Sequence, residues 1–249
     1  MVPQLFSTMS QLLLGFISGF LVNHLSDCLP LHKTILSPVC VNCEKKQAPG
    51  SYLLGKKCME CQQPKSIRFR LVMYLTPILF LFLPIANYSW FGFWIESALI
   101  TYFILILVID IEHRLILTPL ILCGIFLGLI FGFNSIGLAK SVLGGIAAFL
   151  IFIFIYYSGK KLIGLFGNKL KITEIDDPIG FGDIYLAAIT GLILGWPAVL
   201  LGLFGAVVSA GLYSAVYILL MLLQGNYRPF KTIPYGPFII LGMVLALGY

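Results

Sequence analysis

The sequence predicts an all-α polytopic membrane protein of about eight transmembrane helices, with a small cysteine-rich cytoplasmic loop domain. Of its 249 residues, 59% are hydrophobic and only 10% are charged, which lies well outside the averages of soluble domains. The apolar residues gather in long runs, and the basic residues gather in alternate connections between those runs. Most of the chain is therefore expected to have lipid as its solvent.

Eight apolar runs are candidate spans, and they cover residues 5–25, 71–86, 91–109, 115–133, 136–157, 184–194, 198–223 and 233–247. A helix needs about 20 residues to cross the hydrocarbon core, so the second and sixth runs are short for a span. No Lys or Arg precedes the first run and no small-residue cleavage site follows it. It is therefore expected to be a retained span and not a signal peptide.

The basic residues predict the orientation, because short loops rich in Lys and Arg stay in the cytoplasm. With eight alternating spans, 15 of the 16 basic residues are cytoplasmic and only Lys140 is outside. Both termini are then extracytoplasmic. This topology accounts for the net charge of +6, and no basic aromatic stripe accompanies it, so no nucleic-acid partner is expected.

The runs divide the chain into three expected parts. These are a first transmembrane helix at 1–25, a cytoplasmic cysteine-rich loop domain at 26–70, and a seven-helix membrane domain at 71–249. A second cytoplasmic segment, 158–182, is also long enough to fold by itself. Residues 26–70 show little apolar periodicity. A segment of that size without a hydrophobic core needs a bound metal ion or disulfide bonds to fold stably.

Four cysteines in this segment are the candidates for such a cross-link. Cys40 and Cys43 form one C-x2-C pair, Cys58 and Cys61 form another, and 14 residues separate the pairs. Four thiolates at this spacing suit a tetrahedral zinc site. Two disulfides are the alternative, but they are rare in a reducing compartment, so the cytoplasmic location favours the metal. A closed four-sulfur site would fold the loop and take no part in catalysis.

Two acidic residues stand apart from those in loops. Asp110 ends a nearly unbroken apolar run, where a carboxylate is costly and marks a functional candidate. Asp183 begins the sixth run, after Gly180 and Gly182, which remove side-chain bulk and let another backbone approach the carboxylate. These two glycines are therefore candidate substrate-binding positions.

The predicted topology places Asp110 and Asp183 at the same cytoplasmic face. Two adjacent carboxylates share one proton, so the ionised one can activate water while the protonated one polarises a peptide carbonyl, as in aspartic proteases. Helix capping, or pairing of Asp110 with Arg114, is the structural alternative. A transporter that relays ions through carboxylates is a different class of function, but it would need charged partners deeper in the spans.

Several motifs in order resemble the type IV prepilin peptidase family of Gly-x-Gly-Asp intramembrane aspartic proteases. The matching residues are Gly15-Phe16-Ile17-Ser18-Gly19-Phe20, Asn23, Leu29-Pro30, the two C-x2-C pairs, Ser66, Arg68, Asp110, Gly180-Phe181-Gly182-Asp183, Gly191, Gly195-Trp196, Pro234-Tyr235-Gly236-Pro237 and Gly242. The resemblance implies that Asp110 and Asp183 are catalytic.

The resemblance also implies a substrate and a location. The family cleaves the basic leader of type IV prepilin or pseudopilin precursors after a glycine, at the cytoplasmic face of the bacterial inner membrane. Many members then methylate the new N-terminus with S-adenosylmethionine. A chain with the same motifs could alternatively be a catalytically inactive scaffold for pilus assembly. Glu112, Glu174, Asp176 and Asp177 would hold the basic leader by charge complementarity.

The chain departs from the family pattern mainly near the cysteine pairs. Cys28 replaces a usual arginine, and Arg70-Leu71-Val72-Met73 replaces a Pro-x-Val-Glu motif. Ile116-Leu117-Thr118 follows Asp110 in place of Leu-Pro-Asp or Leu-Pro-Asn, and Tyr185 replaces a lysine. These changes bear on methyl transfer more than on proteolysis.

Overall fold

The computed structural model describes residues 2–32, 38, 40, 42–53, 55–82, 90–170, 180–224 and 234–248. Over these residues the regular structure is helical, with no β-strand, which confirms the predicted fold class. The chain divides into two compact units, Met1–His113 and Arg114–Tyr249. Each unit is described by itself, and the domain boundaries expected at residues 25 and 70 stay a prediction.

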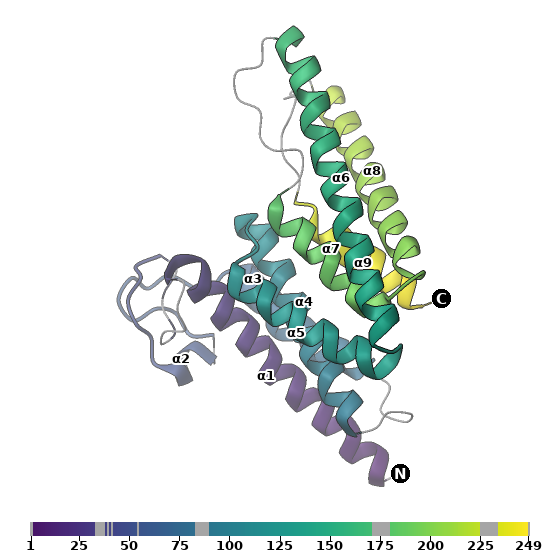
Figure 1. Ribbon diagram of the computed structural model, residues 1–249. Coiled ribbons are helices and arrows are strands. Elements are labelled where there is room, and N and C mark those ends of the chain that lie inside the picture. Colours follow the sequence, from purple (N-terminus) through teal and green to yellow (C-terminus); the bar gives the residue numbers. More distant parts are fainter. Residues whose placement is uncertain are drawn as a thin grey trace. The chain divides into compact units, whose positions relative to one another are not determined.

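Figure 1 labels the helices of the described residues in chain order. Their bounds are α1 Val2–His32, α2 Pro49–Leu53, α3 Ile67–Leu81, α4 Trp90–His113, α5 Thr118–Ser135, α6 Leu138–Leu170, α7 Phe181–Leu194, α8 Val199–Leu223 and α9 Gly236–Leu247. The short α2 lies in the cysteine-rich loop, and the other helices correspond one to one with the apolar runs of the sequence.

Five of the described helices, α1, α4, α5, α6 and α8, are long and apolar enough to cross a membrane. The helices α7 and α9 are equally apolar but shorter, with 14 and 12 residues. The remaining helix, α3, has 15 residues and contains two arginines in its first turn. The chain is thus a multi-pass membrane protein.

In the first unit, α1 packs against α3 and α4 through small and polar residues. A Cβ on Gly15 would lie 2.4 Å from the Cα of Pro77, so this glycine lets α1 and α3 approach to backbone contact. The Thr101 hydroxyl donates to the Ser18 hydroxyl at 2.9 Å, which joins α4 to α1. The Asn23 amide donates to the Phe69 carbonyl at 3.1 Å, which joins α1 to α3.

Two helices continue beyond their predicted ends. The first runs through Pro30 to His32, so residues 26–32 are helical and do not begin the loop. The helix α6 runs to Leu170, so residues 158–170 are helical as well. The end of an apolar run marks the edge of the hydrocarbon layer and not the end of a helix, and Lys160 and Lys161 are good helix formers. The first half of the predicted cytoplasmic segment 158–182 is therefore a continuation of α6.

In the second unit, α7 is nearly enclosed by α5, α6 and α9. A Cβ on Gly144 would lie 2.4 Å from the Gly191 carbonyl oxygen, and a Cβ on Gly191 would lie 2.4 Å from that of Gly144. The two helices therefore touch backbone to backbone. The Ser141 hydroxyl donates to the Leu192 carbonyl at 2.7 Å in the same interface.

The helix α8 packs mainly on α9 and presents its other side outward. A Cβ on Gly242 would lie 2.2 Å from the Gly202 carbonyl oxygen, so these two glycines set the spacing of the pair. Only 11% of the apolar window of α8 is buried within the protein, and Phe204, Leu212 and Leu223 are exposed. Lipid is the natural environment of such a surface.

Candidate functional site

The cysteine loop contains two turns with the same hydrogen bonds. In the first, the Cys40 N–H donates to the Lys45 carbonyl and the Cys40 carbonyl accepts from the Glu44 N–H. In the second, Cys58 makes the equivalent bonds with Gln63 and Gln62. Each turn therefore presents the two sulfurs of one C-x2-C pair on one side. The sequence predicts the two cysteine pairs, but it does not predict that the two turns make the same backbone hydrogen bonds.

The four sulfurs of the loop form one cluster. All lie within 4.8 Å of one another, with Cys40 Sγ 3.6 Å from Cys61 Sγ and Cys43 Sγ 3.7 Å from Cys58 Sγ. A tetrahedron with zinc–sulfur bonds of about 2.3 Å has edges of about 3.8 Å. These cysteines are free thiols and not disulfides. The cluster could therefore bind zinc, as the spacing predicts.

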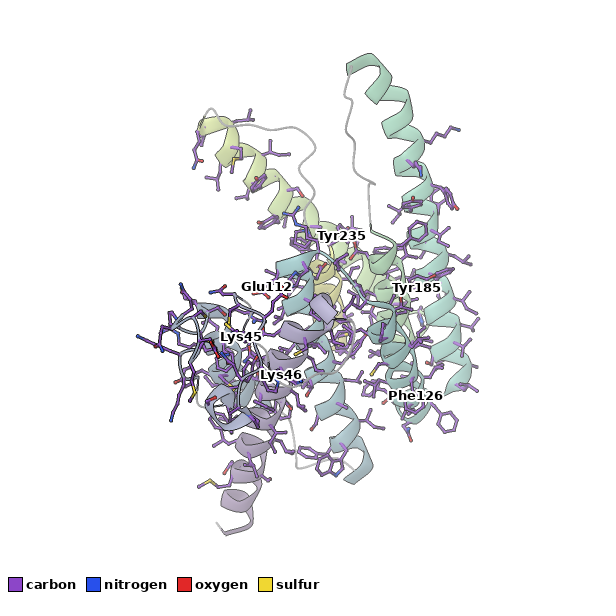
Figure 2. All side chains as sticks on the ribbon, turned by 90° about the vertical axis from the view of Figure 1, so that its left-hand side faces the viewer. Lys45, Lys46, Glu112, Phe126, Tyr185 and Tyr235 are labelled. Carbon is purple, nitrogen blue, oxygen red and sulfur yellow. The ribbon has the colours of Figure 1, made fainter. Side chains whose placement is uncertain are left out.

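The four thiols of the cluster do not ionise alike. The backbone N–H of Cys61 lowers the pKa of the Cys58 thiol to about 6, whereas desolvation and the neighbouring thiols raise the pKa of Cys43 to about 12 and also raise that of Cys61. One ionised sulfur among protonated ones is the pattern of a cluster without its cation, and a metal ion would have to displace the remaining protons. Lys45 Nζ and Glu60 Oε2 form an ion pair at 2.8 Å that joins the two turns. Both side chains are exposed, so the pair contributes little to stability. Figure 2 labels Lys45 and its neighbour Lys46 on this loop.

Tyr52 of α2 anchors the loop to the membrane helices. Its side chain is fully buried, and its ring packs edge-on against Phe69 of α3, with centroids 5.3 Å apart. Burial, followed by the nearby Asp27 carboxylate, raises the pKa of Tyr52. The phenol therefore stays protonated and donates its hydrogen to Asp27 at the end of α1. Lys65 Nζ lies 3.8 Å from the Tyr52 ring centroid.

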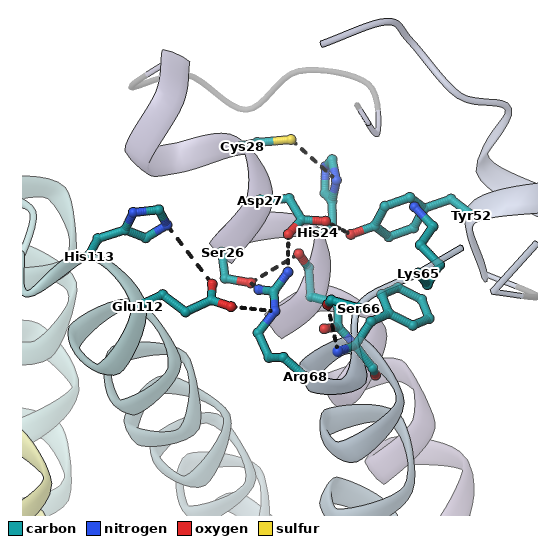
Figure 3. Close-up of polar contacts among 12 residues, drawn as sticks. His24, Ser26, Asp27, Cys28, Tyr52, Lys65, Ser66, Arg68, Glu112 and His113 are labelled. Atoms are coloured by element: carbon teal, nitrogen blue, oxygen red, sulfur yellow. Dashed lines mark hydrogen bonds and ion pairs between the residues drawn. The ribbon is translucent and has the colours of Figure 1, made fainter. Parts of the chain in front are cut away.

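Arg68 of α3 connects three elements of the first unit (Figure 3). Its guanidinium donates to the Ser26 hydroxyl and to the buried Asp27 carboxylate, both on α1. Its Nε lies 3.1 Å from Glu112 Oε1, near the end of α4. Glu112 Oε2 is also 3.9 Å from His113 Nε2. The network continues from Asp27 to Tyr52, so the cysteine loop, α1, α3 and α4 share one chain of polar contacts.

A cavity of about 510 Å³ opens beside this network. Its wall includes the charged side chains of Asp27, Lys65, Arg68 and Glu112, together with polar and aromatic residues of the cysteine loop and α3. The volume lies in the range of small-molecule sites. All the lining residues belong to the first unit.

Asp110 lies in the last turn of α4, where only 4% of it is exposed. Its neighbours Tyr102, Ile106 and Ile109 on the same helix are also buried. Glu112 and His113 complete the helix and are partly exposed. The sequence predicts a functional role for Asp110 because a carboxylate buried at the end of an apolar helix is costly, and its buried position here agrees with that premise.

Asp183 lies in the first turn of α7 and is 8% exposed. Its Oδ2 accepts from the Gly180 N–H at 3.3 Å, so it caps the helix, as the structural alternative expects. Among the described residues, which exclude 171–179, a Cβ on Gly180 would meet only that same oxygen, at 3.2 Å, and the carboxyl carbon of Asp183. A Cβ on Gly182 would lie 2.6 Å from the Ile116 Cβ, so the connection before α5 fills that space. Of the two glycines, Gly180 is the one that lies against the Asp183 carboxylate.

The predicted site residues fall in both units. Asp110, Glu112 and the four cysteines belong to the first, while Gly180, Gly182 and Asp183 belong to the second. Glu174, Asp176 and Asp177 lie outside the described residues. Sequence reasoning missed Asp27, although it ends an apolar run as Asp110 does. The same rule about intramembrane carboxylates would have identified it.

Known proteins resemble this chain over most of its length. Residues 97–215, which contain both Asp110 and Asp183, match the type IV leader peptidase family. Proteins described as prepilin leader peptidase/N-methyltransferase are 32% identical in Aeromonas hydrophila, 31% in Pseudomonas aeruginosa and 29% in Legionella pneumophila. These matches cover 78%, 79% and 78% of this chain.

The chain spans about three fifths of the length of these relatives, with 62% of the Aeromonas and Legionella proteins and 64% of the Pseudomonas protein matched. No solved structure matches the chain.

Proposed function

Since this chain belongs to the type IV leader peptidase family through residues 97–215, we propose that it is a membrane aspartic endopeptidase that removes the basic leader of type IV prepilin or pseudopilin precursors. One observation carries the proposal. The family match encloses two carboxylates that are buried at helix ends, Asp110 at 4% and Asp183 at 8% exposure. Family members act on prepilin substrates in the membrane.

Asp110 and Asp183 are the proposed catalytic pair. With one proton between them, the ionised carboxylate removes a proton from a water molecule while the protonated one donates a hydrogen bond to the scissile carbonyl. Burial favours such sharing, because two adjacent carboxylates in a poorly solvated site do not both ionise. The water attacks the carbonyl carbon, and the proton then passes to the leaving amine.

Gly180 and Gly182 have different proposed roles beside this pair. At Gly180 the absence of a side chain leaves Asp183 Oδ2 approachable by a peptide backbone. Gly182 instead makes room for Ile116, so it supports the entry of α7. Glu112 retains an exposed part that can meet a basic leader, although Arg68 already balances part of its charge.

The remaining partners follow from the family and from the cysteine cluster. We propose that Cys40, Cys43, Cys58 and Cys61 hold a structural Zn²⁺ ion, because four thiols at tetrahedral spacing are its preferred ligands. We propose the bacterial inner membrane as the location, with the termini outside and the catalytic pair at the cytoplasmic face. The relatives are also described as N-methyltransferases, so we propose S-adenosylmethionine as a second substrate.

The decisive experiment is co-expression with candidate prepilins, with the mature N-terminus read by mass spectrometry. Wild-type protein should remove the leader after glycine. Asp110→Asn and Asp183→Asn should each reduce processing by at least 10³-fold, because each removes a group needed in the transition state.

Glu60→Gln is the matched control, since Glu60 is an exposed acidic residue in the cysteine loop. It should process prepilin at the wild-type rate. Leader removal by either aspartate variant at more than one tenth of that rate would contradict the catalytic pair.

A further inference from the structure

Arg68 uses all three nitrogens of its guanidinium to join helices of the first unit (Figure 3). Two of them donate to the buried Ser26 hydroxyl and the buried Asp27 carboxylate of α1. The third, Nε, lies 3.1 Å from Glu112 Oε1 at the end of α4. The guanidinium is a rigid plane, so two nitrogens held on α1 also fix the third. The position of Glu112 is thereby tied to α1.

The carboxylate that holds Arg68 is itself held from its other side. The phenol of the fully buried Tyr52 donates its hydrogen to Asp27, which also accepts from Arg68. A buried charge that loses its partners is costly, so Asp27 has a strong preference for this one position. Arg68 therefore approaches α4 from a rigid base.

The ion pair between Arg68 and Glu112 lies at the end of α4 that carries Asp110. Glu112 is two residues after Asp110, which is about 3 Å along the helix axis. The hydrogen bond from Thr101 to Ser18 also joins α4 to α1, but Thr101 lies nine residues before Asp110, or about 13.5 Å. Of these two contacts, the ion pair is the one close enough to hold the last turn.

The last turn of α4 needs such a contact. The final carbonyls of a helix have no partner within it, so helix ends fray. The helix ends at His113, and Arg114 follows with a φ of 53°, so the chain leaves the helical path three residues after Asp110. Side chains two residues apart point to different sides of a helix. Glu112 can therefore hold the turn from one side while Asp110 serves the reaction on another.

We propose that Arg68 and Glu112 are positioning residues for the peptidase, because their ion pair holds the last turn of α4, and with it Asp110, in the place where this carboxylate acts. The inference rests on the proposed function, in which Asp110 is catalytic. A displacement of about 1 Å at a catalytic group costs roughly 100-fold in rate. Loss of the ion pair should therefore reduce kcat.

Binding of the basic leader by Glu112 predicts different kinetics. Loss of a group that binds the leader raises KM, whereas loss of positioning lowers kcat and leaves KM unchanged. Glu112→Gln adds a second distinction, because glutamine loses the charge but keeps the length and one oxygen that can accept from Arg68. Positioning predicts that this variant recovers part of the activity that Glu112→Ala loses.

Hydrogen exchange of the full chain in lipid nanodiscs tests the turn without any prepilin. Glu112→Ala should raise the exchange rate of amides 110–113 by about fivefold or more and leave amides 97–104 unchanged. Alanine is the best helix former, so faster exchange cannot come from reduced helix propensity. Ile111→Ala is the matched control, since Ile111 is an exposed residue of the same turn. It should exchange as the wild type does.

Cleavage kinetics with a purified prepilin test the consequence for the reaction. Glu112→Ala should lower kcat by about tenfold or more and keep KM within about twofold of wild type, and Ile111→Ala should match wild type. Arg68→Gln should also lower kcat. The double variant of Arg68→Gln and Glu112→Ala should be no slower than Arg68→Gln alone, because both substitutions break the same contact. Assays below the lowest melting temperature of the set exclude unfolding as the cause.

Wild-type exchange in Glu112→Ala would overturn the inference. A Glu112→Ala protein with raised KM and unchanged kcat would also overturn it, in favour of leader binding, and so would a double variant whose loss is the product of the two single losses. A wild-type chain that leaves prepilin uncut contradicts the proposed function instead. The exchange measurement still decides, in that case, whether Arg68 and Glu112 order the turn.

Discussion

Glu44 and Gln62 occupy equivalent positions in the two cysteine turns, with backbone φ angles of 56° and 57°. Each lies four residues after the first cysteine of its pair and donates its N–H to that cysteine's carbonyl. Residues with side chains rarely adopt a positive φ, and glycine does so without cost. The loop therefore stores the same small strain twice, and a metal ion held by the four cysteines would help to keep both turns in this conformation.

Substitutions at Gln62 should separate backbone strain from side-chain contact. Gln62→Gly should keep or raise loop stability by up to about 1 kcal/mol, because glycine accepts this conformation. Gln62→Val should lower it by about 1–2 kcal/mol, because a branched side chain collides with the following carbonyl. Competition with a zinc chelator measures both. Gln63→Val, at a position without a positive φ, is the control and should change metal retention much less than Gln62→Val does.

Removal of the metal should unfold the loop and spare the membrane helices. Chelation, or Cys58→Ser, should expose residues 42–66 to protease, because the binding energy of a structural zinc ion is folding energy for its loop. Limited proteolysis with mass mapping detects the new cuts, and circular dichroism should show nearly unchanged helix content. Cys123→Ser, at an exposed cysteine outside the cluster, should give the wild-type pattern. A protease-resistant loop after complete metal removal would contradict the structural role.

Loss of Arg68 should destabilise the first unit. Arg68→Ala leaves the buried Asp27 carboxylate without its cation, which should cost about 3 kcal/mol. Arg68→Lys should recover part of this, since an ammonium cannot reproduce the forked contacts to Ser26, Asp27 and Glu112. Thermal unfolding in detergent gives the comparison. Arg70→Ala, two residues away and exposed, should stay within about 0.5 kcal/mol of wild type. Equal losses for the two arginines would refute the network as a stabilising element.

Contact between α6 and α7 should not tolerate a methyl group. Gly191→Ala places a Cβ 2.4 Å from the Gly144 carbonyl oxygen, so the helices must separate, at a cost of about 1–3 kcal/mol. Gly211→Ala adds the same methyl where nothing lies within 4 Å, and it should be neutral or slightly stabilising. The difference in melting temperature between these variants measures the interface. A Gly191→Ala protein as stable as Gly211→Ala would show that the helices can move apart freely.

The sequence predicts the helical class and the cysteine cluster well, because both depend on local patterns. Apolar runs specify helices in lipid, and two C-x2-C pairs specify a four-sulfur site whatever lies between them. The two buried aspartates are also predictable, since a carboxylate within an apolar run is conspicuous in any context. The sequence predicts the ends of the helices less well. For example, α6 continues to Leu170, because polar residues that follow a span can remain helical.

Local sequence patterns cannot predict the polar network around Arg68, because its residues come from distant segments of the chain. Asp27, Tyr52, Arg68 and Glu112 are brought together only by the packing of α1, α2, α3 and α4. No spacing rule relates them. The equivalence of Glu44 and Gln62 is hidden for another reason, since their side chains differ and only their backbones correspond.

The short α7 has a further consequence for the bilayer. Its 14 residues extend about 21 Å, and the hydrocarbon layer is about 30 Å thick. Its neighbour α6 has 33 residues and is long enough to span the whole layer. Such hydrophobic mismatch is relieved by thinning the membrane or by admitting water along the short helix. Asp183 lies in the first turn of that helix, so its carboxylate would lie in a local depression of the membrane surface that water can reach.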